Sequence, residues 1–202
     1  MLRFLHTLAW IACIGYSTIP LFWLMIHPFA SFWRGRRSSP FALLLPPWIA
    51  LWIITALITA RWRHLGLYSS QVAWFPAAAL LAGGISVYRR SGAGFSWSQL
   101  AGMPEVRTSR GSTRPLAITG IRAHVRHPIY LAHFCEMLAW SVGSGLAVCY
   151  GLTALTVFTG AVMIALEDRE LTQRFGAAYE RYKRTVPAIF PRRPPRRTPY
   201  NP

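Results

Sequence analysis

The chain has 202 residues, of which 53% are hydrophobic, and its formal net charge at pH 7 is +16. This length suits one domain, and the apolar residues fall in long runs, which argues against a water-soluble globular fold. The basic residues gather between and beyond those runs rather than forming a nucleic-acid patch, so we expect no nucleic-acid partner. The three cysteines stand singly in apolar segments, which excludes a disulfide framework and predicts no metal site.

Three apolar runs come first along the chain, at Phe4–Ile26, Phe41–Ala60 and Val72–Val87, and none contains Lys, Arg, Asp or Glu. A bilayer core of ~30 Å requires roughly 20 residues of helix to cross it. The first two runs meet that length, and the third is shorter. We expect each to form a transmembrane helix.

A further pair of apolar runs covers Ile129–Tyr150 and Gly151–Leu166, interrupted by His133 and Glu136. Glycines mark the expected turn between them, at Gly143, Gly145 and Gly151. The sequence therefore predicts an all-α polytopic membrane protein with about five transmembrane helices, the last two forming a hairpin that continues into a juxtamembrane helix.

The arginines follow the loops that would lie on one side of the membrane. Those between runs one and two, between runs three and four, and in the tail form the larger group (Arg34, Arg36, Arg37, Arg89 to Arg126, Arg192 to Arg197). The opposite side receives Arg3, Arg61 and Arg63. By the positive-inside rule the first group faces the cytoplasm, so five spans place the N-terminus outside and the C-terminus inside.

We expect residues 1–186 to form a single membrane-embedded domain and residues 187–202 to form a Pro/Arg-rich tail. Such a tail is predicted to be extended, poorly packed and attracted to anionic lipid headgroups. We assign it no chemistry.

A dense polar segment precedes the fourth run. It contains Arg122, His124, Arg126, His127 and Tyr130, with Pro128 suited to the first position of a helix. Arg126, His127 and the N-terminus of that helix could together receive a carboxylate or phosphate. Tyr130 could place its ring beside a cation. The alternative interpretation is a basic anchor at headgroup level.

Four of the six acidic residues cluster after the fifth run, at Glu167, Asp168, Glu170 and Glu180. On a helix continuing from that run, Glu170 pairs with Arg174, and Phe175, Tyr179 and Tyr182 form an aromatic stripe. We therefore expect Glu170 and Glu180 to be ordinary surface acids. Glu167 and Asp168 lie at the edge of the hydrocarbon region, where ionisable groups are costly and usually functional.

These two segments share a pattern with known membrane enzymes. The first half is L-x-x-[ST]-G-x-x-x-x-x-R-H-P-x-Y, and the second is E-[ED]-x-x-L-x-x-x-F-G-x-x-Y-x-x-Y-x-x-x-V-P. In this order and spacing the region Leu116–Pro191 resembles the isoprenylcysteine carboxyl methyltransferase and phospholipid methyltransferase group. The resemblance implies S-adenosylmethionine bound at the cytoplasmic membrane face without a Rossmann domain, and a lipophilic or lipid-modified acceptor entering from the membrane lipids.

Carried over by position, the resemblance places a set of residues around the cofactor: Leu116, Ala117, Arg122, His127, Pro128, Ile129, Tyr130 and Glu167. Arg126, Glu167 and Asp168 are the candidate catalytic residues. Glu167 or Asp168 would act as general base toward an amine acceptor, and Arg126 is one candidate to hold an acceptor carboxylate.

The acceptor stays open between a carboxylate, a phospholipid amine and a smaller group such as a thiol. Met163 stands where the prenylcysteine enzymes carry an Arg that would hold the acceptor carboxylate, so its presence weakens the carboxyl-methylation interpretation. Arg122, Ala132 and Asp168 also differ from the residues usual in the resembling enzymes. His133 and Glu136 are candidate substrate-binding residues, or else bond to a neighbouring helix.

Two other classes of protein compete with the methyltransferase. A small membrane transporter or assembly subunit could use His133, Glu136 and Glu167 to line a polar pathway. A membrane reductase of similar helical build would instead require a nicotinamide cofactor.

Overall fold

The computed structural model describes residues 2–29, 32–33, 40–92 and 116–190. Within these residues the fold is all-α, as the sequence predicts. The α-helices are α1 (Leu2–Leu24), α3 (Pro40–Thr59), α4 (Trp74–Arg90), α7 (Pro128–Ser144), α8 (Ala147–Phe175) and α9 (Ala177–Thr185). Short 3-10 turns lie at His27–Phe29, Ala60–Trp62 and Gly120–Ala123.

Three helical segments are long and apolar enough to cross a membrane, at Leu2–Leu24, Ala42–Trp62 and Ala147–Phe175. The helices α4 and α7 are shorter, with 17 residues each. The chain is therefore an integral membrane protein, with five long helices at the places where the five spans were expected. The expected span Val72–Val87 begins two residues later and extends to Arg90.

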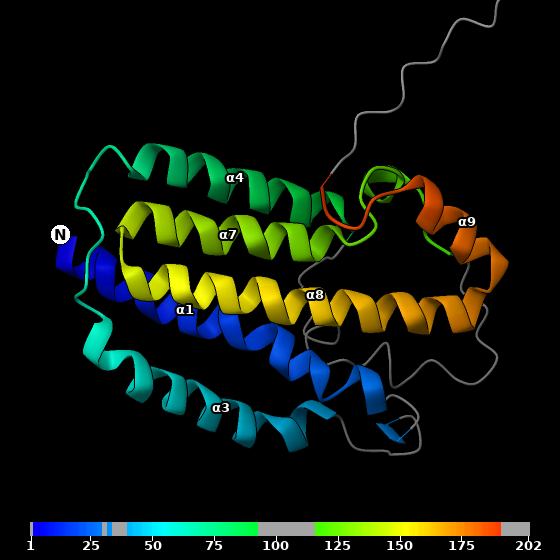
Figure 1. Cartoon of the computed structure of the whole chain (residues 1–202), viewed down its shortest axis with the longest axis horizontal. Helices are drawn as coiled ribbons and strands as arrows, with labels where there is room; N and C mark the ends of the chain where they lie inside the picture. Colours follow the sequence, from blue (N-terminus) through cyan, green and yellow to red (C-terminus); the bar gives the residue numbers. More distant parts are fainter. Residues whose placement is uncertain (1, 30–31, 34–39, 93–115, 191–202) are drawn as a thin grey trace, which may run out of the picture.

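The five long helices lie side by side and alternate in direction (Figure 1). The helix α7 lies between α4 and α8, and α1 packs against both α7 and α8, while α3 packs on α1. As a result, the end of α4, the start of α7 and the end of α8 lie at one end of the bundle. The short helix α9 lies at that same end (Figure 1).

The helix α3 is apolar on every side and leaves large side chains exposed, including Ile53, Leu57 and Ile58. A helix that is hydrophobic all round belongs either in a protein core or in lipid. Because α3 packs mainly along α1 and lies at the margin of the bundle, its exposed surface suits contact with lipid.

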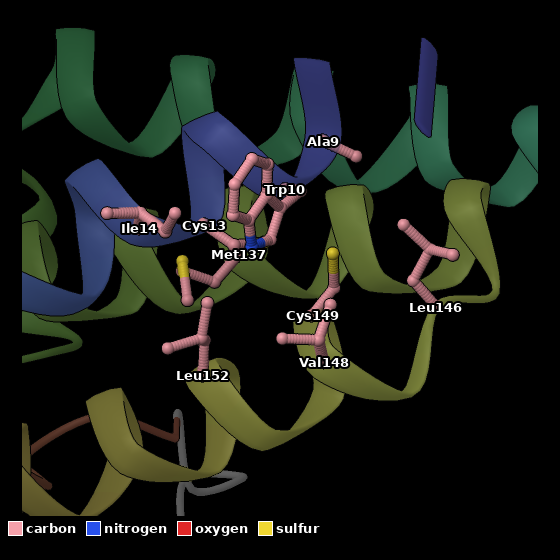
Figure 2. Packing of buried hydrophobic residues seen from close by; sticks show 9 residues of the cluster. All are labelled: Ala9, Trp10, Cys13, Ile14, Met137, Leu146, Val148, Cys149 and Leu152. Atoms are coloured by element: carbon pink, nitrogen blue, oxygen red, sulfur yellow. The ribbon is translucent and has the colours of Figure 1, made fainter. Parts of the chain in front are cut away.

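A cluster of buried apolar residues joins α1, α7 and α8 (Figure 2). Its members are Ala9, Trp10, Cys13, Ile14, Met137, Leu146, Val148, Cys149 and Leu152. Cys13 and Cys149 are fully buried in this cluster and pack among its apolar side chains. This core holds the α7–α8 hairpin against α1.

The contact between α4 and α7 depends on a glycine. A Cβ atom at Gly84 would lie 3.0 Å from the carbonyl oxygen of Ala132 and 3.1 Å from Cγ of Glu136. Small residues let helices approach closely in membranes. Gly84 therefore fixes the separation of α4 and α7 beside the buried Glu136.

The hairpin turn lies at Gly145, one of the three glycines that were expected to mark it. The helix α7 ends at Ser144, six residues before the boundary drawn between the two apolar runs at Tyr150 and Gly151, and Gly151 lies within α8. Gly145 has φ of 65°, a left-handed conformation that glycine adopts without strain, and it ends α7. The apolar run continues through this turn, so hydropathy alone did not locate it.

With 29 residues, α8 is roughly 44 Å long at the usual rise per residue. This exceeds a hydrocarbon core of ~30 Å. The last turns of α8, which carry the acidic cluster, can therefore extend beyond the apolar region.

Candidate functional site

The two halves of the sequence pattern meet at the end of the bundle where α7 begins. His127 is the residue before the first turn of α7, and Pro128 occupies the first helical position, as expected. Across from it, α8 presents Glu167 and Asp168. The His127 Nδ1 atom lies 3.4 Å from Oε2 of Glu167, and its Nε2 atom lies 2.8 Å from Oδ1 of Asp168.

Asp168 is the centre of this network. Its Oδ2 atom accepts a hydrogen bond from Nη2 of Arg126 at 2.9 Å, and its Oδ1 atom faces His127. The Tyr179 hydroxyl also donates to Oδ1. Asp168 is 8% exposed, so a buried carboxylate is stabilised by one guanidinium, one imidazole and one phenol.

Arg126 ties the network to the segment after α9. Its Nη1 atom donates to the carbonyl oxygen of Lys183 at 3.0 Å and to that of Val186. The backbone N–H of Arg126 donates to the carbonyl of Pro187 at 2.9 Å. Both Nη atoms of the buried Arg126 side chain therefore already bind groups of the protein.

The first residues of the expected tail belong to this arrangement. Pro187 and Ala188 accept backbone hydrogen bonds from Arg126 and His127, each at 2.9 Å. Phe190 packs edge-on against Phe134 of α7, with ring centroids 6.3 Å apart. This part of the chain holds the loop before α7 in place.

His127 lies between two carboxylates, and its environment changes its proton affinity. Burial alone would lower the pKa of His127, but hydrogen bonds and charges from Asp168 and Glu167 outweigh it and raise the pKa above its ordinary value. Since each ring nitrogen faces a carboxylate, the doubly protonated imidazolium satisfies both. Glu167, with a side chain 28% exposed, is the more accessible of the two acids.

Tyr130 lies one turn into α7 and adjoins the same site. Its ring centroid is 6.0 Å from that of His127, at an interplanar angle of 70°. On the α8 side the ring lies against Gly160, where an added Cβ would be 3.8 Å from it. Tyr130 and Glu167 also interact electrostatically across the two helices. Tyr130 therefore lies on the side of the site toward the middle of the α7–α8 hairpin, with Glu167 beside it.

The loop before α7 carries the remaining expected cofactor residues. Arg122 donates from Nη1 to the carbonyl of Arg126 at 3.3 Å, and its own carbonyl accepts from the Tyr182 hydroxyl at 2.6 Å. Leu116 is half-buried and Ala117 is exposed, both just ahead of the 3-10 turn Gly120–Ala123. Arg122 is thus connected to the network, and Leu116 and Ala117 precede it in the chain.

The two expected substrate residues lie deeper along α7. His133 packs edge-on against Tyr16 of α1, with ring centroids 5.7 Å apart. Glu136 is 7% exposed and interacts with Tyr16 and Tyr88, which come from α1 and α4. They form a polar cluster within the bundle, between one and two turns beyond Tyr130. Met163 is fully buried on α8.

Tyr179 joins the site although the sequence indicated only an aromatic stripe on one continuous helix. The helix instead breaks at Gly176, which has φ of 54°, and α9 turns so that Tyr179 reaches back to Asp168. The Phe-Gly pair at 175–176 is the sequence signal for that break. Among the residues that the structure describes, no group of three His, Cys, Asp or Glu side chains could hold a metal ion.

No family model matches the chain, and no solved structure matches it. Among curated proteins, the chain is similar to the Delta(14)-sterol reductase of Mus musculus, with 31% identity over 90 residues. The match covers 44% of this chain and 21% of the reductase, so it spans about a fifth of that relative's length. The similarity supports an enzyme in this membrane fold and does not by itself distinguish methyl transfer from reduction.

Proposed function

We propose that the protein is an S-adenosylmethionine-dependent methyltransferase that acts on a lipophilic acceptor at the cytoplasmic face of the membrane. The observation that carries the proposal is the meeting of the two motif halves, with His127 3.4 Å from Glu167 and 2.8 Å from Asp168. The approach of these residues from both halves at one end of a membrane bundle supports the proposal.

The residues at this site fit the proposed cofactor. S-adenosylmethionine supplies, when bound, a methyl group on a positively charged sulfur. Glu167 offers a partly exposed carboxylate, and the half-buried ring of Tyr130 lies beside it, so the pair suits a cationic group. The first turn of α7 adds backbone N–H groups that helix bonds do not use, which favour a carboxylate.

The buried groups hold this surface in position. Asp168 accepts hydrogen bonds from three side chains, and the Arg126 Nη atoms bind Asp168 and two backbone carbonyls. In our proposal Arg126 and Asp168 therefore orient His127, and Glu167 is the acid that contacts cofactor or acceptor. Orientation within a dry site supplies most of the acceleration for a displacement of this kind.

The acceptor would approach along α7 from the membrane, where His133 and Glu136 form the inner polar cluster. With an apolar, fully buried Met163 at the position of the resembling enzymes' arginine, a carboxylate acceptor lacks that partner. A phospholipid amine would instead give up a proton to Glu167 before attack.

A membrane reductase with a nicotinamide cofactor is the second candidate, and the similarity to a Delta(14)-sterol reductase favours it. The same network would then orient a different cofactor, and Glu167 would face a nicotinamide nucleotide instead of a sulfonium. The two candidates differ in the ligand that they bind.

Calorimetric titration of purified protein in detergent distinguishes them. S-adenosylmethionine, S-adenosylhomocysteine, NADH and NADPH are titrated into wild type, Glu167→Gln and His127→Gln. We expect saturable binding of the first two ligands only, with affinity in both variants at least about tenfold weaker, a loss of ~1.4 kcal/mol.

Glu180→Gln is the matched control. Glu180 lies on α9, and its carboxylate accepts a hydrogen bond from the Thr172 hydroxyl at 3.0 Å rather than contacting His127. It should bind like wild type. Binding of NADPH alone would replace the methyltransferase proposal with the reductase. Binding of none of the four ligands to folded protein would reject both enzymes and favour a transport or assembly role.

A further inference from the structure

Arg126 is bound in an unusual way. Its Nη2 atom donates to Oδ2 of Asp168 at 2.9 Å, while its Nε atom is buried and has no hydrogen-bond partner in the part of the chain that the structure describes. A guanidinium normally binds a carboxylate through two parallel N–H groups. A side-on pair through Nε and Nη2 would satisfy the unpaired donor, so the observed geometry leaves Arg126 short of its best contact.

The other oxygen of the carboxylate explains this geometry. Oδ1 of Asp168 faces His127 Nε2 at 2.8 Å and also accepts from the Tyr179 hydroxyl. Tyr179 is 1% exposed and is held by α9, so its hydroxyl has a fixed position. Two donors on Oδ1 keep the carboxylate turned away from Nε of Arg126.

We propose that Tyr179 is a positioning residue whose hydroxyl holds Asp168 on His127 and prevents the carboxylate from rotating into a two-bond pair with Arg126. His127 then keeps partners on both ring nitrogens and stays aligned with Glu167. The geometric part of the inference is independent of the cofactor. Its consequence for ligand affinity rests on the proposed function.

Loss of the Tyr179 hydroxyl should therefore change the protonation of His127. The groups facing this imidazole are Glu167 and Asp168 from α8 and the Tyr130 ring from α7, with Arg126 across Asp168. When Asp168 turns to Arg126, the imidazole loses the closer of its two acids. Burial then favours the neutral ring, and the pKa of His127 falls.

The test is a pH titration of the protein in detergent with isotope-labelled histidine, followed by nuclear magnetic resonance. The His127 signal is identified by its absence in His127→Gln. We expect Tyr179→Phe to titrate at a lower pH than wild type while its thermal unfolding stays cooperative. Tyr68→Phe is the control. It removes a phenol hydroxyl at the opposite end of the bundle, so the titration midpoint of His127 should stay at the wild-type value.

Arg126→Lys separates positioning from simple loss of a hydrogen bond. Lysine has no Nε–Nη2 fork, so removal of the Tyr179 hydroxyl in this background should lower the His127 midpoint less than it does in wild type. An equal decrease in both backgrounds overturns the proposed competition with Arg126. A wild-type midpoint in folded Tyr179→Phe overturns the role of Tyr179.

Ligand binding is measured on the same samples with S-adenosylhomocysteine. We expect Tyr179→Phe to bind roughly five- to tenfold more weakly, the effect of one hydrogen bond to a charged network. Wild type that binds no S-adenosylhomocysteine would reject the proposed function, yet the histidine titrations would still decide the inference about Tyr179.

Discussion

The α7–α8 hairpin is fastened at both ends, but by different chemistry. At the turn of the hairpin, the loop after α3 binds the hairpin through uncharged groups. The backbone N–H of Leu67 donates to Gly145 O at 2.8 Å, and the Tyr68 hydroxyl lies 2.7 Å from Val142 O and 2.8 Å from the Tyr150 hydroxyl. Short neutral bonds are therefore sufficient to hold this end.

The open end of the hairpin is also held by backbone hydrogen bonds, and charged side chains lie beside them. Arg126 and His127 donate their backbone N–H groups to Pro187 and Ala188, each at 2.9 Å. Beside these bonds lie two basic side chains and two carboxylates, of which Asp168 is buried. Since uncharged groups hold the other end, the charges here are better explained by function than by stability.

Asp168→Asn should show the largest effect of any change at either end. It keeps the shape of the side chain but leaves the Arg126 guanidinium buried beside a neutral amide. Removal of one partner of a buried ion pair typically costs about 3–5 kcal/mol. We expect a loss of this size in denaturant unfolding in detergent, with Glu180→Gln as a control at a largely solvated pair. A loss below about 1 kcal/mol, as at a surface pair, would contradict this account of the network.

Gly145→Ala tests the neutral end. Gly145 has φ of 65°, and an added Cβ would lie 2.5 Å from the Tyr68 carbonyl oxygen. We expect roughly 1–3 kcal/mol of destabilisation from the left-handed conformation, with ligand binding retained below the unfolding temperature. The control is Gly151→Ala in α8, where nothing lies within 4 Å, and there alanine should stabilise by up to about 1 kcal/mol. Equal effects at both glycines would show that the turn does not require this conformation.

The charged end should also respond to pH, and the neutral end should not. The pKa of His127 is raised in the folded protein, so its contribution to stability is fully present below the ordinary value of about 6.5. That contribution is lost as pH rises through the raised pKa. The unfolding free energy of wild type should therefore exceed that of His127→Gln most at low pH, and the difference should shrink as pH rises through the raised pKa of His127. A difference that stays constant with pH would mean that His127 does not titrate in this range.

Much of the structure at the charged end could be predicted from the sequence. Long apolar runs without charge identified the helices, and Pro128 after His127 marked the start of α7. A hairpin brings the first residues of one helix to the last residues of the next, so the approach of Glu167 to His127 followed from connectivity alone.

Other contacts depend on the path of the chain through space, which periodicity does not report. Tyr179 lies 11 residues after Asp168, and it reaches that carboxylate only because the helix breaks at Gly176. The Arg126 side chain binds backbone carbonyls, which every residue carries, so residue types could not indicate those partners. The turn was predicted only to lie among Gly143, Gly145 and Gly151, because apolar residues continue on both sides of Gly145.

Tyr68→Phe should have the smallest effect. The variant keeps the ring and loses a hydroxyl that lies near Val142 O and the Tyr150 hydroxyl, at an exposed position where water can replace these bonds. A hydrogen bond of this kind contributes about 0.5–1.5 kcal/mol, so we expect a loss near or below the lower limit, measured by denaturant unfolding. Tyr179→Phe removes the same group at the charged end and should cost more, because it leaves a buried carboxylate short of a donor. Equal losses in the two variants would mean that the charged end, like the neutral end, only holds the helices together.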